Sequence, residues 1–305
     1  MIKYSDGEPS RDKVMADKNV KNHLIELIEF TDPYCTWCWG SEPVLRKIGE
    51  VYGNQVKISY VMGGLVKDIK DFHDLQNRIG GKDWGRQVAK HWLEASEAHG
   101  MPVDEKVFYD IENGHWSTYP ANVAAKAAEF QGMEKATKFL RRLREAASAE
   151  RKQIHKEAVQ AALASEIGLD QTGLLSDIRS GVAREAFNRD LTICRTYGVN
   201  GFPTFLIRDR EGNENIIRGY HQFEYFEQVF RDLSLNLREQ KREFNEENIL
   251  RFIRKHGRVA TIEVTVLFNV GKVQASQSLE VLTEKKRINK VKTGNDFFWT
   301  FKFSD

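Results

Sequence analysis

Apolar and β-favouring residues run from His23 to Thr31, and an amphipathic helical pattern then continues to about Glu50. The alternation of apolar and polar residues between Gln55 and Met62 predicts a second strand directly behind that helix. A strand, a helix and a strand in such close succession indicate a βαβ unit, in which a right-handed crossover joins two parallel strands. The sequence therefore predicts an α/β fold at the start of the chain.

Helical periodicity dominates residues 67–197. Ala-rich segments with apolar residues three and four positions apart follow one another there, separated by glycines and prolines. The segments are Trp84–His99, Ala121–Phe130, Glu134–Ala147, His155–Ile167, Gln171–Arg179 and Ala183–Tyr197. Strand-like sequence lies on both sides of this block, so we interpret it as an all-helical insertion into the sheet domain rather than as a separate domain.

Strand character returns at Thr204–Arg208, and Asn215–Arg218 follows across a turn that contains Gly212. Two strands separated by a short glycine-containing turn are typical of a β-hairpin. Gln222–Leu235 predicts a closing helix, and the charged residues from Arg238 to Glu247 indicate a linker.

The end of the chain has a pattern of its own. Its helical segments are Glu247–His256, Ala260–Asn269 and Val273–Lys286, and two alternating stretches follow at Asn289–Lys292 and Phe297–Phe301. The residues between those stretches, Thr-Gly-Asn-Asp, are a hairpin signal. Three helices followed by a β-hairpin predict a winged-helix-like module at 245–305. We therefore divide the chain into a disordered lead (1–20), an α/β domain (21–237) with the helical insertion at about 67–197, and this module.

Length and composition limit the class of protein. A chain of 305 residues exceeds one ordinary core, and its mean hydropathy of -0.53 is that of a soluble protein. No apolar run approaches the length of a membrane span, and the polar first twenty residues lack the apolar stretch of a secretory signal. Three cysteines are too few for a disulfide scaffold. We expect a cytoplasmic protein with no membrane partner.

The charge is distributed unevenly along the chain. From Lys241 onward there are 13 Lys and Arg against 8 Asp and Glu, whereas the preceding part has 33 against 36. Some of the basic residues, Lys285, Lys286, Arg287 and Lys290 among them, fall at the end of the third tail helix and in the first strand of the hairpin. A winged helix with a basic wing can bind a duplex, but this run is short. We therefore favour a protein-docking or dimerising module over nucleic-acid binding.

The stretch between the first strand and its helix contains Cys35-Thr36-Trp37-Cys38. A C-x-x-C pair at a helix N-terminus is typical of a redox-active dithiol, because the free N–H groups and the helix dipole favour the thiolate of the first cysteine. Cys38, one turn further on, can then resolve a mixed disulfide by attacking Cys35. The alternatives are half a zinc site or an inert pair. Zinc needs four ligands, and only Cys194 and scattered histidines remain.

Two further positions supply what a dithiol site needs. Glu29 precedes Cys35 by six residues on the incoming strand. It is either a solvated strand residue or, as its position favours, a buried acid that exchanges protons with Cys38 and has a raised pKa. Pro203 opens a strand after a glycine-containing loop and is a candidate for a cis peptide bond with Phe202. That geometry would leave the neighbouring backbone free to pair with an extended substrate.

The segment FTDPYCTWCWGSEP (30–43), the acid at Glu29, the helical insertion and GFPTF (201–205) together resemble the DsbA-like branch of the thioredoxin superfamily, in particular the FrnE-type predicted dithiol–disulfide isomerases. The resemblance covers residues 24–235. It implies a thioredoxin-like sheet with an inserted helical domain and needs neither an organic cofactor nor a metal. The residues that it implies are Cys35 as nucleophile, Cys38 as resolving cysteine, Glu29 as buried acid and Pro203 as the cis-proline, with Thr36, Trp37, Phe202 and Thr204 beside the substrate.

The implied activity is that of a thiol–disulfide oxidoreductase or isomerase. It would act on protein thiols and disulfides and exchange electrons with a cytosolic reductant of the thioredoxin or glutathione type. The dipeptide Thr36-Trp37 differs from the Pro-His of the strongly oxidising periplasmic members, so the sequence leaves the direction of electron flow open.

A second resemblance covers the whole layout. The body followed by the ending ENILRFIRKHG…NKVKTGNDFFWTF is similar to the SpxH-type ClpXP adaptors, which deliver a regulator to a protease. That group typically begins with a Cys/His-rich metal-binding segment, whereas His23 is the only Cys or His before Cys35. The alternative functions are therefore a non-enzymatic adaptor that uses the same groove and tail, and a redox-gated regulator whose winged helix touches DNA.

Overall fold

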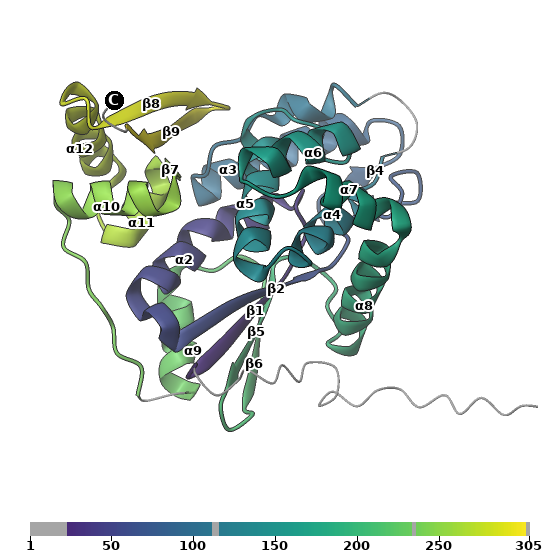
Figure 1. Ribbon diagram of the computed structural model, residues 1–305, viewed down its shortest axis with the longest axis horizontal. Helices are drawn as coiled ribbons and strands as arrows, with labels where there is room; N and C mark the ends of the chain where they lie inside the picture. Colours follow the sequence, from purple (N-terminus) through teal and green to yellow (C-terminus); the bar gives the residue numbers. More distant parts are fainter. Residues whose placement is uncertain (1–22, 112–115, 234–235, 303–305) are drawn as a thin grey trace, which may run out of the picture.

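The computed structural model describes residues 23–111, 116–233 and 236–302. Its central sheet contains β1 (Ile25–Thr31), β2 (Val56–Met62), β5 (Thr204–Asp209) and β6 (Glu214–Arg218), in the order β2-β1-β5-β6. Strand β1 runs parallel to β2 and antiparallel to β5, and β5 pairs antiparallel with β6 (Figure 1). The predicted βαβ unit and the predicted hairpin are both confirmed. The predicted lead at 1–20 lies outside the described residues.

Strand β1 is central and covered on both faces, which explains its nearly unbroken apolar sequence. Ile25 and Leu27 point toward helices α2 (Thr36–Tyr52) and α9 (Phe223–Leu233), whereas Ile28 and Phe30 point toward α8 (Val182–Thr196) on the opposite face. Side chains alternate along a strand, so Glu29 shares the face of Ile25 and Leu27. Glu29 therefore lies beneath α2.

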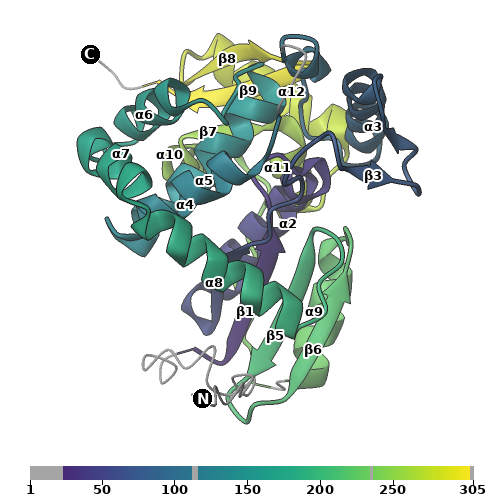
Figure 2. The ribbon, with the colours of Figure 1, turned by 90° about the vertical axis from the view of Figure 1, so that its right-hand side faces the viewer.

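The block between β2 and β5 is helical, as predicted, and each predicted helix is present with ends that differ by at most two residues. Its helices are α3 (Trp84–His99), α4 (Tyr119–Glu129), α5 (Met133–Ala149), α6 (Glu157–Glu166), α7 (Gln171–Ser180) and α8, with the 3₁₀ turn η3 (Glu105–Phe108); a similar turn, η2 (Gly53–Gln55), precedes β2. A small hairpin of β3 (His73–Asp74) and β4 (Ile79–Gly80) precedes α3. The alanines on α4 and α5 are buried in the largest apolar cluster of the described residues. Helix α8 leaves this block and crosses the sheet (Figure 2).

The C-terminal module contains α10 (Glu246–His256), β7 (Arg258–Ala260), α11 (Thr261–Phe268), α12 (Lys272–Glu284), β8 (Ile288–Thr293) and β9 (Asp296–Phe301). The predicted helices and hairpin are present, and the sheet has the order β7-β9-β8. Strand β7 is not among the predicted elements, because a strand of three residues carries no period of its own. The module has its own core, in which Phe252, Leu279 and Trp299 are buried.

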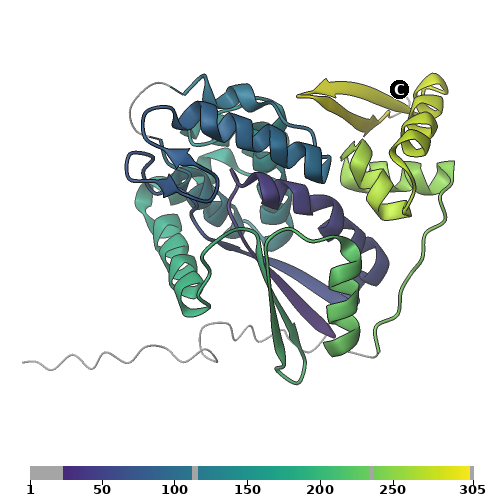
Figure 3. The same cartoon turned by 180° about the vertical axis from the view of Figure 1, so that it is seen from behind.

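The module packs against the outer side of α2, and the segment after α9 runs along the outside of the molecule to reach it (Figure 3). The backbone N–H of Gln240 in this segment donates to the carbonyl oxygen of Val51 at 2.8 Å. On the other side, the Asn295 side chain accepts a hydrogen bond from the backbone N–H of Val103 at 2.9 Å. Helix α2 is thus enclosed between the sheet and the module. Within the described part of the chain, no helix combines the length and apolar character of a membrane span.

Candidate functional site

Cys35 and Cys38 lie at the start of α2, where Cys35 is the N-cap residue. The backbone N–H of Cys38 donates to the sulfur of Cys35 at 3.1 Å. In most helices a side-chain oxygen occupies this capping position. Here the sulfur takes that place, and the N–H lies where it would stabilise a negatively charged Sγ. Both cysteines are buried as free thiols, and Cys35 is the more exposed of the two.

Cys38 has the opposite environment. Burial raises the pKa of the Cys38 thiol well above its usual range, the hydrogen bond with Cys35 raises it further, and Arg144 lowers it in part. Cys38 is therefore a thiol that must lose a proton before it can attack another sulfur. Cys35 is the better placed of the two to react first.

Glu29 is completely buried, which excludes the alternative of a solvated strand residue. Burial raises the pKa of its carboxyl to about 7, a shift that Arg144 opposes and Glu42 increases. A carboxyl with this pKa exchanges its proton near neutral pH. Glu29 lies on the same face of β1 as the helix that carries Cys38, so burial and proton affinity both agree with the expected buried acid.

Sequence reasoning missed Arg144, whose side chain is fully buried beside Glu29. Its Nη2 lies 3.0 Å from Glu29 Oε2 and also donates to the Thr31 hydroxyl. Its Nη1 donates to Glu42 on α2. Burial alone would raise the pKa of Glu42, but Arg144, Arg141 and Arg46 outweigh it and lower that pKa to about 2. Arg144 therefore lies between Glu29, whose carboxyl titrates near neutral pH, and Glu42, whose carboxyl stays ionised.

Further ion pairs connect this arginine to the C-terminal module. Glu42 lies 3.2 Å from Arg141 Nη1. Arg141 in turn holds both oxygens of Glu263 on α11, at 3.0 and 3.2 Å, and Arg46 reaches the same carboxylate at 2.8 Å. We call this buried series, Glu29–Arg144–Glu42–Arg141–Glu263, the ion-pair chain.

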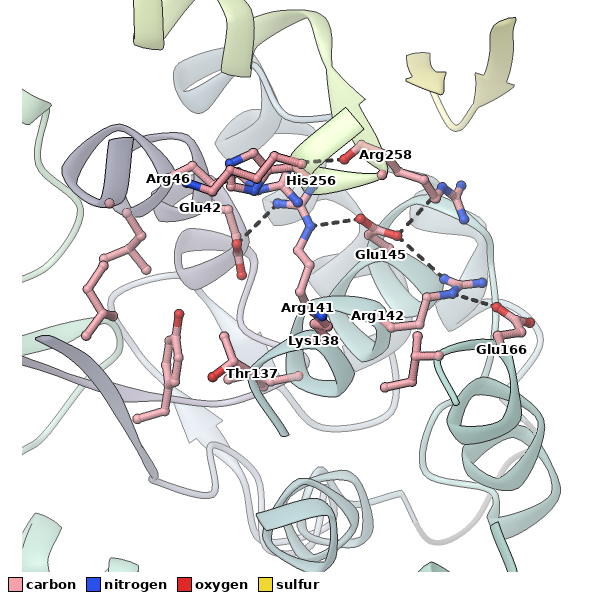
Figure 4. A pocket seen from close by; sticks show the side chains of 18 of the residues that line it. Glu42, Arg46, Thr137, Lys138, Arg141, Arg142, Glu145, Glu166, His256 and Arg258 are labelled. Carbon is pink, nitrogen blue, oxygen red and sulfur yellow. Dashed lines mark hydrogen bonds and ion pairs between the residues drawn. The ribbon is translucent and has the colours of Figure 1, made fainter. Parts of the chain in front are cut away.

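A cavity of about 680 Å³ lies between α2, α5 and the module, beside the ion-pair chain. Figure 4 shows Arg141 between Glu42 and Glu145, and Arg142 between Glu145 and Glu166. Among the described residues that line this cavity, neither Cys35 nor Cys38 is present. The cavity therefore lies behind the dithiol rather than around it.

The Phe202–Pro203 peptide bond is cis, as predicted. Strand β5 begins immediately afterwards, and Thr204 pairs with Phe30 near the end of β1 from which the chain turns toward Cys35. The proline and the dithiol thus lie at the same end of the sheet. The Thr204 side chain is buried, and its hydroxyl donates to the Gly201 carbonyl at 2.8 Å.

The two residues between the cysteines face different surroundings. Trp37 is half-buried and packs against the rings of His99 and Tyr220, with centroid distances of 5.9 and 5.8 Å. Thr36 is buried, and its hydroxyl lies 3.4 Å from His99 Nε2. Burial lowers the pKa of His99 to about 4. Its Nδ1 accepts the Met101 N–H, so the neutral ring carries its proton on Nε2 and donates to Thr36. Of the two residues, only Trp37 keeps part of its side chain accessible to solvent.

His99 also packs directly on Gly40 of α2, which yields a stability prediction. A Cβ atom at Gly40 would lie 2.5 Å from ring atoms of His99. Because both residues are in the core, we expect Gly40→Ala to lower the free energy of unfolding by about 1–3 kcal/mol in a urea titration. The control is Gly49→Ala on the same helix, where no described atom beyond the helix lies within 4 Å of that position. It should gain up to about 1 kcal/mol; equal effects of the two substitutions would contradict the packing argument.

Asp32 holds the loop before the cysteines, a role that sequence reasoning also missed. It is buried, and its Oδ1 accepts the N–H of Tyr34 at 2.8 Å. Its Oδ2 accepts hydrogen bonds from the Thr118 hydroxyl and the Asn122 amide at 2.6 and 2.7 Å. The C-x-x-C loop is therefore anchored to α4 of the insertion. The sequence signal for this role is the spacing of Asp32 and Tyr34, because an Asp side chain in a turn often accepts the N–H of the residue two positions later.

The third cysteine lies elsewhere. Cys194 is buried on α8, on the face of the sheet opposite α2. Burial, with a contribution from Asp190, raises the pKa of its thiol to about 12. Cys194 is thus part of an apolar cluster on that face. Among the described residues, no group of three or more His, Cys, Asp and Glu side chains is arranged to hold a metal ion.

A family model described as thioredoxin matches residues 29–228. The ClpXP adapter protein SpxH of Halalkalibacterium halodurans is 28% identical over 286 residues, which cover 93% of this chain and 91% of that protein. Among solved structures, a proposed protein disulfide isomerase from Nitrosomonas europaea has a TM-score of 0.56 at 21% identity, and it covers 69% of this chain and 96% of that one.

A second structural neighbour is the cytosolic disulfide reductase DsbM from Pseudomonas aeruginosa. Its TM-score is 0.51 at 22% identity, with 63% of this chain and 89% of that chain covered. At these identities the structural likenesses establish the fold of the body. The adapter relative aligns over a length that must also include most of the C-terminal module.

Proposed function

The chain belongs to the thioredoxin family, and from that premise we propose that it is a cytoplasmic thiol–disulfide oxidoreductase or isomerase acting on protein disulfides. The observation that carries this proposal is the placement of Cys35 at the N-cap of α2, with its sulfur hydrogen-bonded to the Cys38 amide. An inert pair of buried cysteines would need neither this helix terminus nor a titrating carboxyl beneath it.

In the proposed reaction, the Cys35 thiolate attacks one sulfur of a substrate disulfide. A mixed disulfide forms, and the other substrate sulfur leaves as a thiolate. Cys38 then gives its proton to Glu29 and attacks Cys35. The Cys35–Cys38 disulfide forms, and the substrate leaves with two electrons gained. A reductant of the thioredoxin or glutathione type returns two electrons to the pair; run in reverse, the same steps oxidise or rearrange a substrate.

We place the substrate at the end of the sheet where Pro203 and Trp37 lie. The backbone next to the cis-proline would pair with an extended chain, and the accessible part of the half-buried Trp37 ring would contact its apolar side chains. Phe202 would line the same edge. In this proposal Thr36 and Thr204 support that surface from beneath, because both are buried.

Equilibration in graded thiol/disulfide buffers, read by alkylation and mass, tests the proposal. We expect a reversible two-electron transition of Cys35 and Cys38, with Cys194 unmodified throughout. A potential near about -270 mV would indicate a reductase or isomerase, and one near about -120 mV an oxidant. If no reversible transition appears and both thiols react slowly with the alkylating agent, the proposed activity is wrong.

A second candidate function is that of an adaptor which presents a protein to a protease. The observation that favours it is the similarity to a ClpXP adapter protein over 93% of the chain, the module included. We propose that the module is winged-helix-like and docks protein rather than nucleic acid. Its apolar residues Val273 and Val281 on α12 are exposed, and protein docking would cover them. The two functions are separable, because delivery to a protease does not require sulfur chemistry.

A further inference from the structure

The two carboxylate oxygens of Glu29 have different surroundings. Oε2 accepts a hydrogen bond from Arg144 Nη2 at 3.0 Å. Oε1 is buried, and none of the residues that the structure describes donates a hydrogen bond to it. Leaving a buried carboxylate oxygen without a hydrogen-bond donor costs free energy, so its occurrence in a folded protein calls for an explanation. Here it is the oxygen left free to accept a proton.

Arg144 is held by partners other than Glu29. Its guanidinium donates to Glu42 on α2 and to Thr31 on β1 as well as to Glu29. The side chain is fully buried between the sheet, α2 and α5. A planar guanidinium with three fixed partners defines the orientation of each of them. Arg144 therefore fixes which oxygen of Glu29 remains unpaired.

We propose that Arg144 is a positioning residue for the resolving half of the reaction, in which it holds Glu29 by Oε2 so that Oε1 accepts the proton of Cys38. This inference rests on the proposed function and adds a residue to it. The proton moves from the Cys38 sulfur to Glu29 Oε1, and the negative charge moves from Glu29 to the Cys38 sulfur. The thiolate then attacks Cys35, the Cys35–Cys38 bond forms, and the substrate thiolate leaves.

The electrostatics of this transfer favour a fixed cation at the position of Arg144. The charged and titratable groups that face Glu29 are Cys38 and Glu42 from α2, Arg144 from α5 and Tyr60 from β2. Arg144 stabilises an anion on Glu29 and also one on Cys38. The net charge of this buried group is the same before and after the transfer, so no charge has to be created in the core.

The test compares Arg144→Gln with Arg142→Gln, which removes another buried, ion-paired arginine of α5 that contacts Glu150 and Glu166 instead. After the full-length protein is mixed with an aromatic disulfide, release of the second aromatic thiol reports the resolving step in a stopped-flow experiment. For Arg144→Gln we expect the pH midpoint of this step to rise by about one to three units and its rate at pH 7 to fall about tenfold or more. Arg142→Gln should match the parent protein.

A double-mutant cycle separates positioning from a general loss of structure. If Arg144 acts through Glu29, Arg144→Gln should add little to the effect of Glu29→Gln. An unchanged pH midpoint, or the same loss with and without Glu29, would overturn the inference. If Arg144→Gln does not fold, Arg144→Lys takes its place: one ammonium group cannot hold all three partners, so an intermediate midpoint is expected, and the parent midpoint would argue against us. A parent protein with no resolving step would instead refute the proposed function.

Discussion

Replacement of Cys35 by Ser is expected to lower the rate of protein disulfide reduction by at least about a thousandfold, the order of loss that follows removal of a covalent nucleophile. The reason is the position of the sulfur. Cys35 caps α2 and accepts the Cys38 N–H, whereas Cys38 lies deeper and its burial raises the pKa of its thiol. Cys38 therefore cannot substitute for it. The measurement is turnover of a disulfide-linked protein substrate in the presence of a dithiol reductant.

The matched control is Cys194→Ser, which removes a buried thiol on the other face of the sheet and should leave turnover unchanged. The same variants distinguish the two candidate functions. If delivery of a bound protein to a protease survives Cys35→Ser while reduction is lost, the chain has both activities. Full retention of disulfide reduction by Cys35→Ser would remove the oxidoreductase from consideration and leave the adaptor.

Replacement of Glu263 by Ala is expected to lower the free energy of unfolding by about 3–5 kcal/mol, the usual result of removing one partner of a buried ion pair. Glu263 is completely buried, accepts both guanidinium groups of Arg46 and Arg141, and also accepts the Ala260 N–H at 2.7 Å. Its loss leaves two buried arginines with fewer counter-charges at the contact between the module and the body. Urea unfolding followed by circular dichroism measures the change.

Glu280→Ala is the control for this prediction, because Glu280 pairs with Lys290 at the surface of the same module. Exposed pairs contribute less than about 1 kcal/mol, so this variant should unfold close to the parent protein. A loss no greater for Glu263→Ala than for Glu280→Ala would mean that the ion-pair chain does not hold the module in place.

The fold could be predicted where its signals are local. Three such signals are the alternation in residues 55–62, the helical period of α3 and the glycine in the turn before β6. Each depends only on residues a few positions apart, so it can be found in the sequence alone. Cys35 and Cys38 could be assigned for the same reason. Pro203 and Glu29 were candidates for a local reason as well, since Pro203 opens a strand after a glycine-containing loop and Glu29 precedes Cys35 by six residues. Which end and which face of the sheet they share with the cysteines depends on the pairing of distant strands.

Arg144 could not have been predicted in this way. It lies 115 residues from Glu29, in a helix where neighbouring arginines suggest an ordinary solvated polar face. Its burial follows from how α5 crosses between the sheet and α2, which is a tertiary fact that periodicity does not contain. The orientation of Thr36 is a similar case. Its position between the cysteines suggested contact with substrate, whereas His99, from a different helix, draws its hydroxyl inward.

The enclosure of α2 limits the direction from which any partner can reach the sulfur. Of the 17 residues of this helix only Trp37, Arg46 and Gly49 are not buried, and the last two line the cavity beneath the C-terminal module. A folded surface therefore cannot lie along the helix. In the proposed reaction, a loop or a chain end that reaches the helix tip beside Trp37 would therefore present its disulfide to Cys35 more readily than a flat folded surface would. The proposed activity would then depend on the local mobility of the segment that carries the substrate disulfide as well as on its sequence.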